Sequence, residues 1–143
     1  MTNPAITPEA IAERIAGSFP GDLGVEPLEF TDEYATGRIV VDERHLHPGG
    51  VVHGGVWVGL ADSVAAWQTF LHLPPGHDFT TIEMKLNVFG AGLPGRELVA
   101  TARHLHAGRS THVVEAQVHD GDKRVANLVV TQFVVPPREE SDG

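Results

Sequence analysis

Two glycines and one carboxylate, spaced along a single apolar segment, are the residues of this sequence best suited to chemistry. Gly54 and Gly55 stand where a helix is expected to begin, and Asp62 is the only charged residue between Gly54 and Leu71. The first N–H groups of a helix lack intrahelical partners and favour negative charge, which suits a carbonyl turning into an oxyanion. A carboxylate among apolar neighbours tends to have a raised pKa, as a general base or nucleophile requires. The structural alternatives are a tight loop entering a helix and a solvated helix acid.

The spacing of these groups has a consequence for assembly. Eight positions separate Gly54 from Asp62, which is about 12 Å along an α-helix at roughly 1.5 Å per residue. One carbonyl carbon therefore cannot touch both groups of the same chain. If both act on one substrate, we expect the acid to come from a second subunit that lies antiparallel across a two-fold axis.

The remaining sequence predicts the elements that would position these groups. Residues 54–73 carry apolar side chains at three- and four-residue steps and stop at Pro74, which predicts one long, enclosed helix. A short amphipathic helix begins at Thr7-Pro8 and ends at Pro20-Gly21. Strand patterns cover residues 24–30, 34–41, 79–89, 96–107, 110–120 and 124–135. These elements predict an α+β fold whose first two strands form a hairpin, whose last three form a meander, and whose sheet wraps the helix.

The segment around the helix start resembles a known family. His47-Pro48-Gly49-Gly50-Val51-Val52-His53-Gly54-Gly55 and Leu60-Ala61-Asp62 are similar to the HGG…LAD/LAE segment of hotdog-fold acyl-CoA thioesterases of the PaaI-like and 4-hydroxybenzoyl-CoA groups. The strand at 81–87 and the Thr131-Gln132 pair look like theirs too. The resemblance implies a hotdog domain at residues 24–135, an antiparallel sheet of about six strands around one long central helix. It leaves an N-terminal helical segment at 1–23 and a polar tail at 136–143 that we expect to be disordered.

The resemblance also implies an activity. An acyl-CoA thioester would be hydrolysed to free acid and CoA, with the Gly54 amide as oxyanion donor and Asp62 of the partner subunit as general base or nucleophile. His47 occupies a position where these enzymes usually carry Asn or Gln, and an imidazole there can donate a hydrogen bond but adds a pH dependence. His53 belongs to the same candidate catalytic group, although bracing the loop is its favoured role over proton transfer. Gly55 and Ala66, on the same helix, are candidate substrate-binding residues.

For the nucleotide of coenzyme A, the resemblance points to one strand connection. It comprises His106, Ala107, Gly108, Arg109, Ser110 and Thr111. The Arg109 guanidinium could pair with a phosphate through two hydrogen bonds. A hairpin turn with an exposed arginine is an equally good interpretation of these residues.

Composition limits the other classes of function. The formal net charge is −9, with 19 acidic against 10 basic residues, which disfavours a nucleic-acid binder. The chain has no cysteine, and its 9 histidines form no HExxH motif, so no metal site is predicted. No dinucleotide fingerprint or phosphate-binding P-loop occurs, so coenzyme A is expected only as part of the substrate. Without a recognisable signal or a membrane-spanning apolar segment, we expect a cytoplasmic protein.

Two other functions remain open from the sequence. A hotdog hydratase or dehydratase would share the fold but pair a histidine and an aspartate differently on its substrate. A non-catalytic acyl-CoA or small-ligand binding protein is also conceivable, because His47 and Gly90 both depart from the residues usual in the resembled family. In each case we expect a homodimer or a tetramer of two dimers, because the helix face and the strand edges need cover. The acyl group is not indicated.

Overall fold

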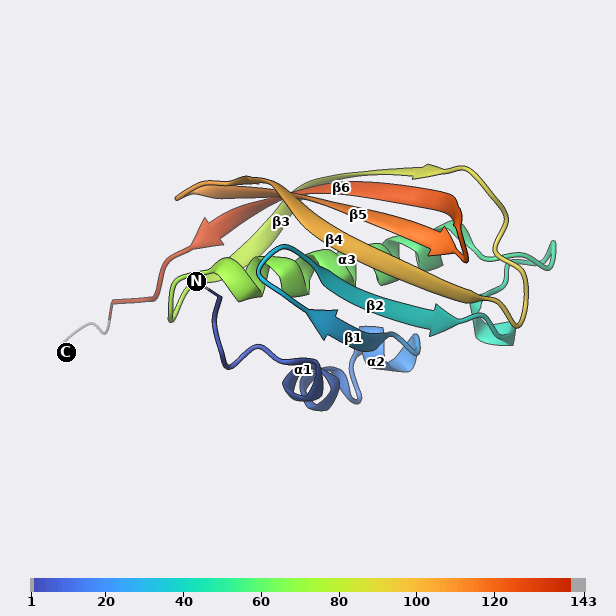
Figure 1. Cartoon of the computed structure of the whole chain (residues 1–143), viewed down its shortest axis with the longest axis horizontal. Helices are drawn as coiled ribbons and strands as arrows, with labels where there is room; N and C mark the ends of the chain where they lie inside the picture. Colours follow the sequence, from blue (N-terminus) through green and yellow to red (C-terminus); the bar gives the residue numbers. More distant parts are fainter. Residues whose placement is uncertain (1, 140–143) are drawn as a thin grey trace.

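A six-stranded antiparallel sheet wraps around one long helix, α3 (Figure 1), in a computed structural model that describes residues 2–139 of the 143. The strands lie in the order β1-β2-β4-β5-β6-β3, so the hairpin, the meander and the α+β class are confirmed. The elements are α1 (Pro8–Ile15), α2 (Phe19–Asp22), β1 (Glu26–Phe30), β2 (Ala35–Val40), the short 3₁₀ helix η1 (Glu43–His45), α3 (Gly54–His72), β3 (Asp78–Val88), β4 (Glu97–Ala107), β5 (Thr111–Asp120) and β6 (Lys123–Val135).

The concave face of the sheet encloses much of α3. Leu60, Ala61, Val64 and Ala65 are fully buried, against inward-facing residues of β4, β5 and β6 that include Ala100, Ala102, Val114, Ala116 and Leu128. Small side chains on both surfaces bring the helix close to the strands. At Gly37 of β2 the approach requires glycine, because a Cβ there would lie 2.6 Å from Cζ3 of Trp67.

The N-terminal segment differs from its prediction. Thr7 caps the first helix as expected, accepting a hydrogen bond from the Ala10 N–H at 3.1 Å. The helix ends at Ile15, however, and does not run on to Pro20-Gly21. Ala16 leaves the helical conformation with a ψ of 128°, and Gly17 follows with a positive φ of 75°. Pro20 lies in the first turn of α2, where a missing N–H costs nothing. The single predicted helix is therefore two.

The two edges of the sheet differ in length. β1 forms one edge with 5 residues, whereas β3 forms the other with 11 and pairs only with β6. Side chains of β3 are exposed on both faces, including Ile82 at 58% and Met84 at 38%. A long edge strand with exposed apolar side chains is suited to pairing with another chain.

The chain ends bear on the predicted segments. Residues 136–139 are exposed and belong to no helix or strand, while Met1 and residues 140–143 lie outside the described residues. The division at residues 23 and 135 stays a prediction. Within residues 2–139, no helix has the length and apolarity that crossing a bilayer would take.

A polar cluster interrupts the core near the C-terminal end of α3. His104 of β4 lies between Gln68 of α3 and His112 of β5, with its Nδ1 3.2 Å from Gln68 Nε2 and its Nε2 2.9 Å from His112 Nδ1. The His72 ring packs edge-on against His104 at 4.9 Å. A neutral His104 that accepts from Gln68 and donates to His112 satisfies both contacts. Burial, reinforced by His112 and His72, lowers the pKa of His104 to about 4, and burial also lowers the pKa of His112.

The free energy of unfolding should therefore depend on pH through this cluster. The pKa of His104 is lower in the folded chain than in the unfolded chain, where it is near 6.5, so only the unfolded chain takes up the proton between these values. Stability should be full above pH of about 6.5 and decline as the pH falls toward about 4. Urea unfolding of wild type and His104→Gln across this range should show a shallower decline in the variant. His119→Gln, outside the cluster, is the control, and equal slopes for all three proteins would contradict the prediction.

Candidate functional site

The loop that leads into α3 is braced by its own histidines. The Gly49 N–H donates to Nδ1 of His47 at 2.8 Å, and the Gly55 N–H donates to Nδ1 of His53 at 2.8 Å. His53 is thus the N-cap of α3, where its ring satisfies one of the free helix-start donors. Because Nδ1 accepts in both rings, each neutral imidazole carries its proton on Nε2 and can donate from there.

Gly54 is left with a free backbone donor at the helix start. The next two N–H groups are used, since Gly55 donates to the His53 ring and Val56 donates to the His53 carbonyl oxygen at 2.9 Å. Among residues 2–139 the Gly54 N–H has no such acceptor. The space beside Gly54 is also open, with no atom within 4 Å of where a Cβ would stand. An external oxygen could therefore accept this hydrogen bond, and the helix dipole would favour negative charge on it.

Asp62 lies near the middle of α3 and lines a pocket of about 590 Å³ between α3 and the N-terminal helices. Burial raises the pKa of its carboxyl group above the usual range. None of the hydrogen bonds or ion pairs formed within residues 2–139 uses its carboxylate. The hydroxyls of the two serines in the pocket are already used by the backbone. Ser18 donates to the Ile15 carbonyl oxygen, and Ser63 donates to the Gly59 carbonyl oxygen. The carboxylate is thus free to meet a substrate or a water molecule.

The pocket brings some of the predicted site residues together. Gly55, Asp62 and Ala66 line it from one face of α3. The sequence does not predict the opposite wall, which comes from the N-terminal segment. This wall consists of Ile11, Arg14, Ile15, Ser18, Phe19 and Pro20. Helical spacing had indicated an amphipathic α1, but nothing in the sequence indicated which surface its apolar side would cover.

The strand connection predicted to hold the nucleotide is a tight turn between β4 and β5. The Gly108 N–H donates to the Thr111 carbonyl oxygen at 2.8 Å, and the Ser110 carbonyl oxygen accepts from the Val134 N–H at 2.8 Å. Arg109 and Ser110 line a pocket of about 300 Å³ beside β6. His106 and Ala107 are exposed on the β4 side of the turn.

One chain does not bring all the predicted residues together. The β4–β5 turn lies near the C-terminal half of α3, since His104, close before it, contacts Gln68 and His72. Gln68 is fourteen positions, or about 21 Å of helix, beyond Gly54. The helix-start donor, the carboxylate and the arginine turn are therefore spread along the length of α3. Within residues 2–139, no group of three or more acidic or histidine side chains is arranged to hold a metal ion.

The chain is similar to known thioesterases in both sequence and structure. The model of the family described as "Thioesterase superfamily" matches residues 49–127, more than half of the chain. Putative esterase PA1618 of Pseudomonas aeruginosa is 33% identical over 119 residues, which are 81% of each chain. The 1,4-dihydroxy-2-naphthoyl-CoA hydrolase of Listeria monocytogenes is 28% identical over 72% of this chain and 83% of its own.

Solved structures agree with this relationship. A crystal structure of a mutant of thioesterase PA1618 has a TM-score of 0.86 and 30% identity, covering 91% of this chain and 94% of that one. The structure of smu.793 from Streptococcus mutans, bound to acetyl CoA, has a TM-score of 0.73 and 26% identity, covering 80% and 91%. The chain is thus an enzyme with the hotdog fold, and it belongs to the thioesterase superfamily.

Proposed function

We propose that this enzyme hydrolyses acyl-CoA thioesters at a site that combines the Gly54 N–H of one subunit with Asp62 of its partner. The observation that carries the proposal is Asp62 itself, a carboxylate in a mostly apolar pocket that has no partner among residues 2–139 and whose pKa burial raises. Coenzyme A as the thiol is supported by two relatives, one named a CoA hydrolase and one bound to acetyl CoA.

The chemistry follows from the two groups. The Asp62 carboxylate either attacks the thioester carbon or takes a proton from a water molecule that attacks it. In both routes the carbonyl π electrons move to oxygen, and the Gly54 N–H and the helix dipole stabilise the resulting oxyanion. When the oxyanion collapses, the C–S bond breaks and CoA leaves as a thiolate that takes up a proton. If Asp62 attacks, water then hydrolyses the acyl anhydride and releases the acid.

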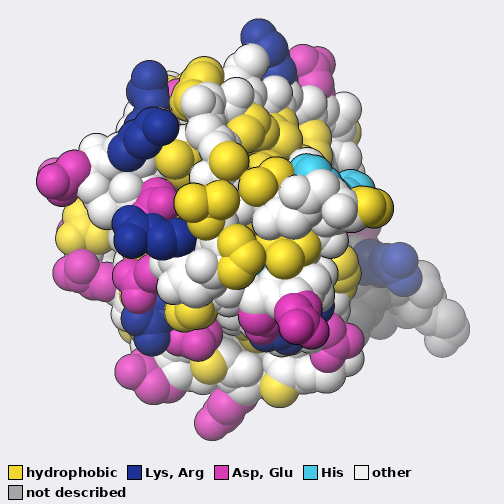
Figure 2. Space-filling model, turned by 90° about the vertical axis from the view of Figure 1, so that its right-hand side faces the viewer, with side chains coloured by type: hydrophobic (Ala, Val, Ile, Leu, Met, Phe, Trp, Pro, Cys, Tyr) yellow, Lys and Arg dark blue, Asp and Glu magenta, His cyan; other side chains and the backbone are white. Residues whose placement is uncertain are grey.

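A second subunit is supported by the edge of the sheet and by distance. β3 offers an unpaired backbone edge together with exposed apolar side chains, and antiparallel pairing of two such edges is compatible with a two-fold axis. Hydrophobic side chains also gather at the end of the molecule where α3 begins (Figure 2), and Phe89 and Leu93 of the β3–β4 connection are about half exposed. A homodimer, alone or paired into a tetramer, would cover these surfaces.

Asp62→Asn should retain the fold and lose at least about a hundredfold in kcat, because the side chain keeps its size but can neither attack nor accept a proton. Release of free CoA from a panel of aryl and aliphatic acyl-CoAs, followed with a thiol reagent, measures the loss. Asp122→Asn, in the exposed β5–β6 turn, is the matched control and should behave as wild type. Activity of Asp62→Asn within a few-fold of wild type would refute its role.

Mixing two inactive variants should restore activity if the site spans two chains. Gly54→Pro removes the N–H at the first helical position, where proline is tolerated, and the preceding His53 has the extended ψ of 143° that proline favours. Refolding equal amounts of Gly54→Pro with Asp62→Asn should give about a quarter of wild-type activity, since half of the dimers then hold one intact site.

Gly54→Ala is the control for this experiment, because it keeps the N–H and its Cβ meets open space. It should keep most of the activity that Gly54→Pro loses. Light scattering should show a species larger than the 15.3 kDa monomer at assay concentration. A monomer, or mixed variants that stay inactive although they form heterodimers, would contradict a two-chain site.

Arg109→Ala should raise KM for acyl-CoA more than it lowers kcat, because a phosphate contact remote from the carbonyl binds ground state and transition state alike. An exposed ion pair is worth roughly 0–1 kcal/mol, so the change should be about several-fold at low salt and smaller at high salt. The same acyl group carried on pantetheine, which lacks the nucleotide, should show no effect. If KM for acyl-CoA is unchanged at low salt, Arg109 is only a turn residue.

A further inference from the structure

The pocket beside Asp62 is suited to an acyl chain and not to the pantetheine arm. Its walls are mainly apolar, with Ile11 and Ile15 of α1 facing Val58, Trp67 and Phe70 of α3. Pantetheine carries two amides that need hydrogen-bond partners when they are buried. The serine hydroxyls of the pocket already donate to backbone carbonyl oxygens, so they offer no free donor. Hydrocarbon gains most from such a surface.

Arg14 supplies the one cation among the lining residues of this pocket. Its Cζ lies 5.5 Å from the centroid of the Phe70 ring, and it forms no ion pair with any residue between 2 and 139. The aromatic face attracts the guanidinium but is a weak hydrogen-bond acceptor, so the N–H donors of Arg14 remain available to an anion.

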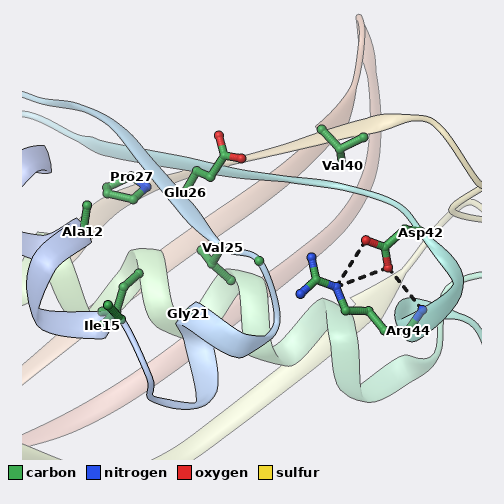
Figure 3. Close-up of a pocket in the computed structure, with 11 residues that line it drawn as sticks. Ala12, Ile15, Gly21, Val25, Glu26, Pro27, Val40, Asp42 and Arg44 are labelled. Carbon is green, nitrogen blue, oxygen red and sulfur yellow. Dashed lines mark hydrogen bonds and ion pairs between the residues drawn. The ribbon is translucent and has the colours of Figure 1, made fainter.

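The neighbouring pocket provides a contrast. A hollow of about 510 Å³ between the N-terminal helices and β1 also contains an arginine, Arg44 (Figure 3). The Arg44 Nε donates to both carboxylate oxygens of Asp42 at 3.2 Å, and its Nη1 donates to the Asp22 carbonyl oxygen. Two of the three guanidinium nitrogens of Arg44 thus donate within the protein, whereas the Arg14 guanidinium makes no hydrogen bond or ion pair with residues 2–139.

The positions of Asp62 and Arg14 define a length. The Arg14 guanidinium lies over the ring of Phe70, which is eight positions beyond Asp62 on α3. The guanidinium is therefore on the order of 12 Å along the helix from the Asp62 carboxylate. A chain whose carbonyl reacts at Asp62 and which follows the apolar wall would end beside Arg14.

We infer that this pocket takes the acyl chain and that Arg14 binds a negatively charged group at its far end, so that the enzyme prefers thioesters of dicarboxylic acids to neutral acyl thioesters of the same length. This assignment rests on the proposed function, because it places the reacting carbonyl at Asp62. The terminal carboxylate would receive a charge-assisted hydrogen bond from Arg14 at the end of this mostly apolar pocket that is remote from Asp62.

Equilibrium binding tests the inference without requiring turnover. Calorimetric titration of Asp62→Asn with suberyl-CoA and octanoyl-CoA, which share chain length, should show about tenfold tighter binding of suberyl-CoA, as one partly exposed charge-assisted contact provides. Adding Arg14→Gln should abolish the preference by weakening suberyl-CoA alone, and Arg14→Lys should restore part of it. Arg124→Gln is the matched control, because Arg124 lies 5.3 Å from the Phe89 ring, outside the pocket.

Pantetheine thioesters separate the acyl carboxylate from the CoA phosphates as the anion that Arg14 meets. The preference should persist for suberyl- over octanoyl-pantetheine, which carry no nucleotide. Equal weakening of suberyl-CoA and octanoyl-CoA by Arg14→Gln, with no effect on the pantetheine thioesters, would assign Arg14 to a phosphate and overturn the inference. The absence of any preference in the Asp62→Asn protein would overturn it as well. If the preference is present but wild type hydrolyses neither thioester, the proposed function fails and the binding assignment stands.

Discussion

Enclosure of α3 by the sheet is the constraint on which the rest of the structure depends. A helix that is covered over much of its circumference must be apolar, and every polar group that it carries inward must find a partner or remain costly. Near the C-terminal end, Thr69 meets this requirement by donating to Gln132, whereas Gln68 meets it only in part, because its Nε2 contacts His104 but its buried Oε1 has no hydrogen-bond partner within residues 2–139. Asp62 does not, because no donor reaches it within the described chain. Its raised pKa is the direct consequence of the surroundings that make α3 stable.

The same helix sets the distances of the site. Its first turn presents the Gly54 N–H, its middle presents Asp62, and its far end supports the β4–β5 turn through His104. A rigid helix cannot bend these groups toward one another, so the reaction that we propose requires a second subunit whose α3 runs in the opposite direction. The long, exposed edge of β3 gives such a copy a place to attach.

Local patterns predicted the elements well where one pattern dominated. The apolar period of α3 and the proline that follows it, Pro74, predicted a helix over residues 54–73, which ends one residue later than the observed helix. The alternation of apolar residues in the strands predicted the hairpin and the meander. The N-terminal helix was predicted too long because Ala16 leaves the helical conformation and Gly17 follows with a positive φ, and apolar spacing does not report either. Gly54 and Asp62 could be predicted as candidate site residues from the sequence because both lie in one continuous segment. The wall formed by Ile11 and its neighbours could not, because it meets α3 only through long-range packing. The histidine cluster likewise depends on the register of β4 against β5.

The construction of the pocket from two unlike walls affects how the protein can change over evolution. The α3 wall shares its residues with the core, so a substitution there disturbs the sheet as well as the pocket. The opposite wall belongs to a short segment that joins the rest of the molecule at few points, and only Ile11 within it is fully buried, whereas Phe19 is 67% exposed. Mutations in residues 11–20 can therefore reshape the surface that we propose faces the acyl chain, at small cost to stability. Related chains that differ in substrate preference should therefore differ in sequence mainly in this N-terminal segment, whereas the helix that carries Asp62 should vary little.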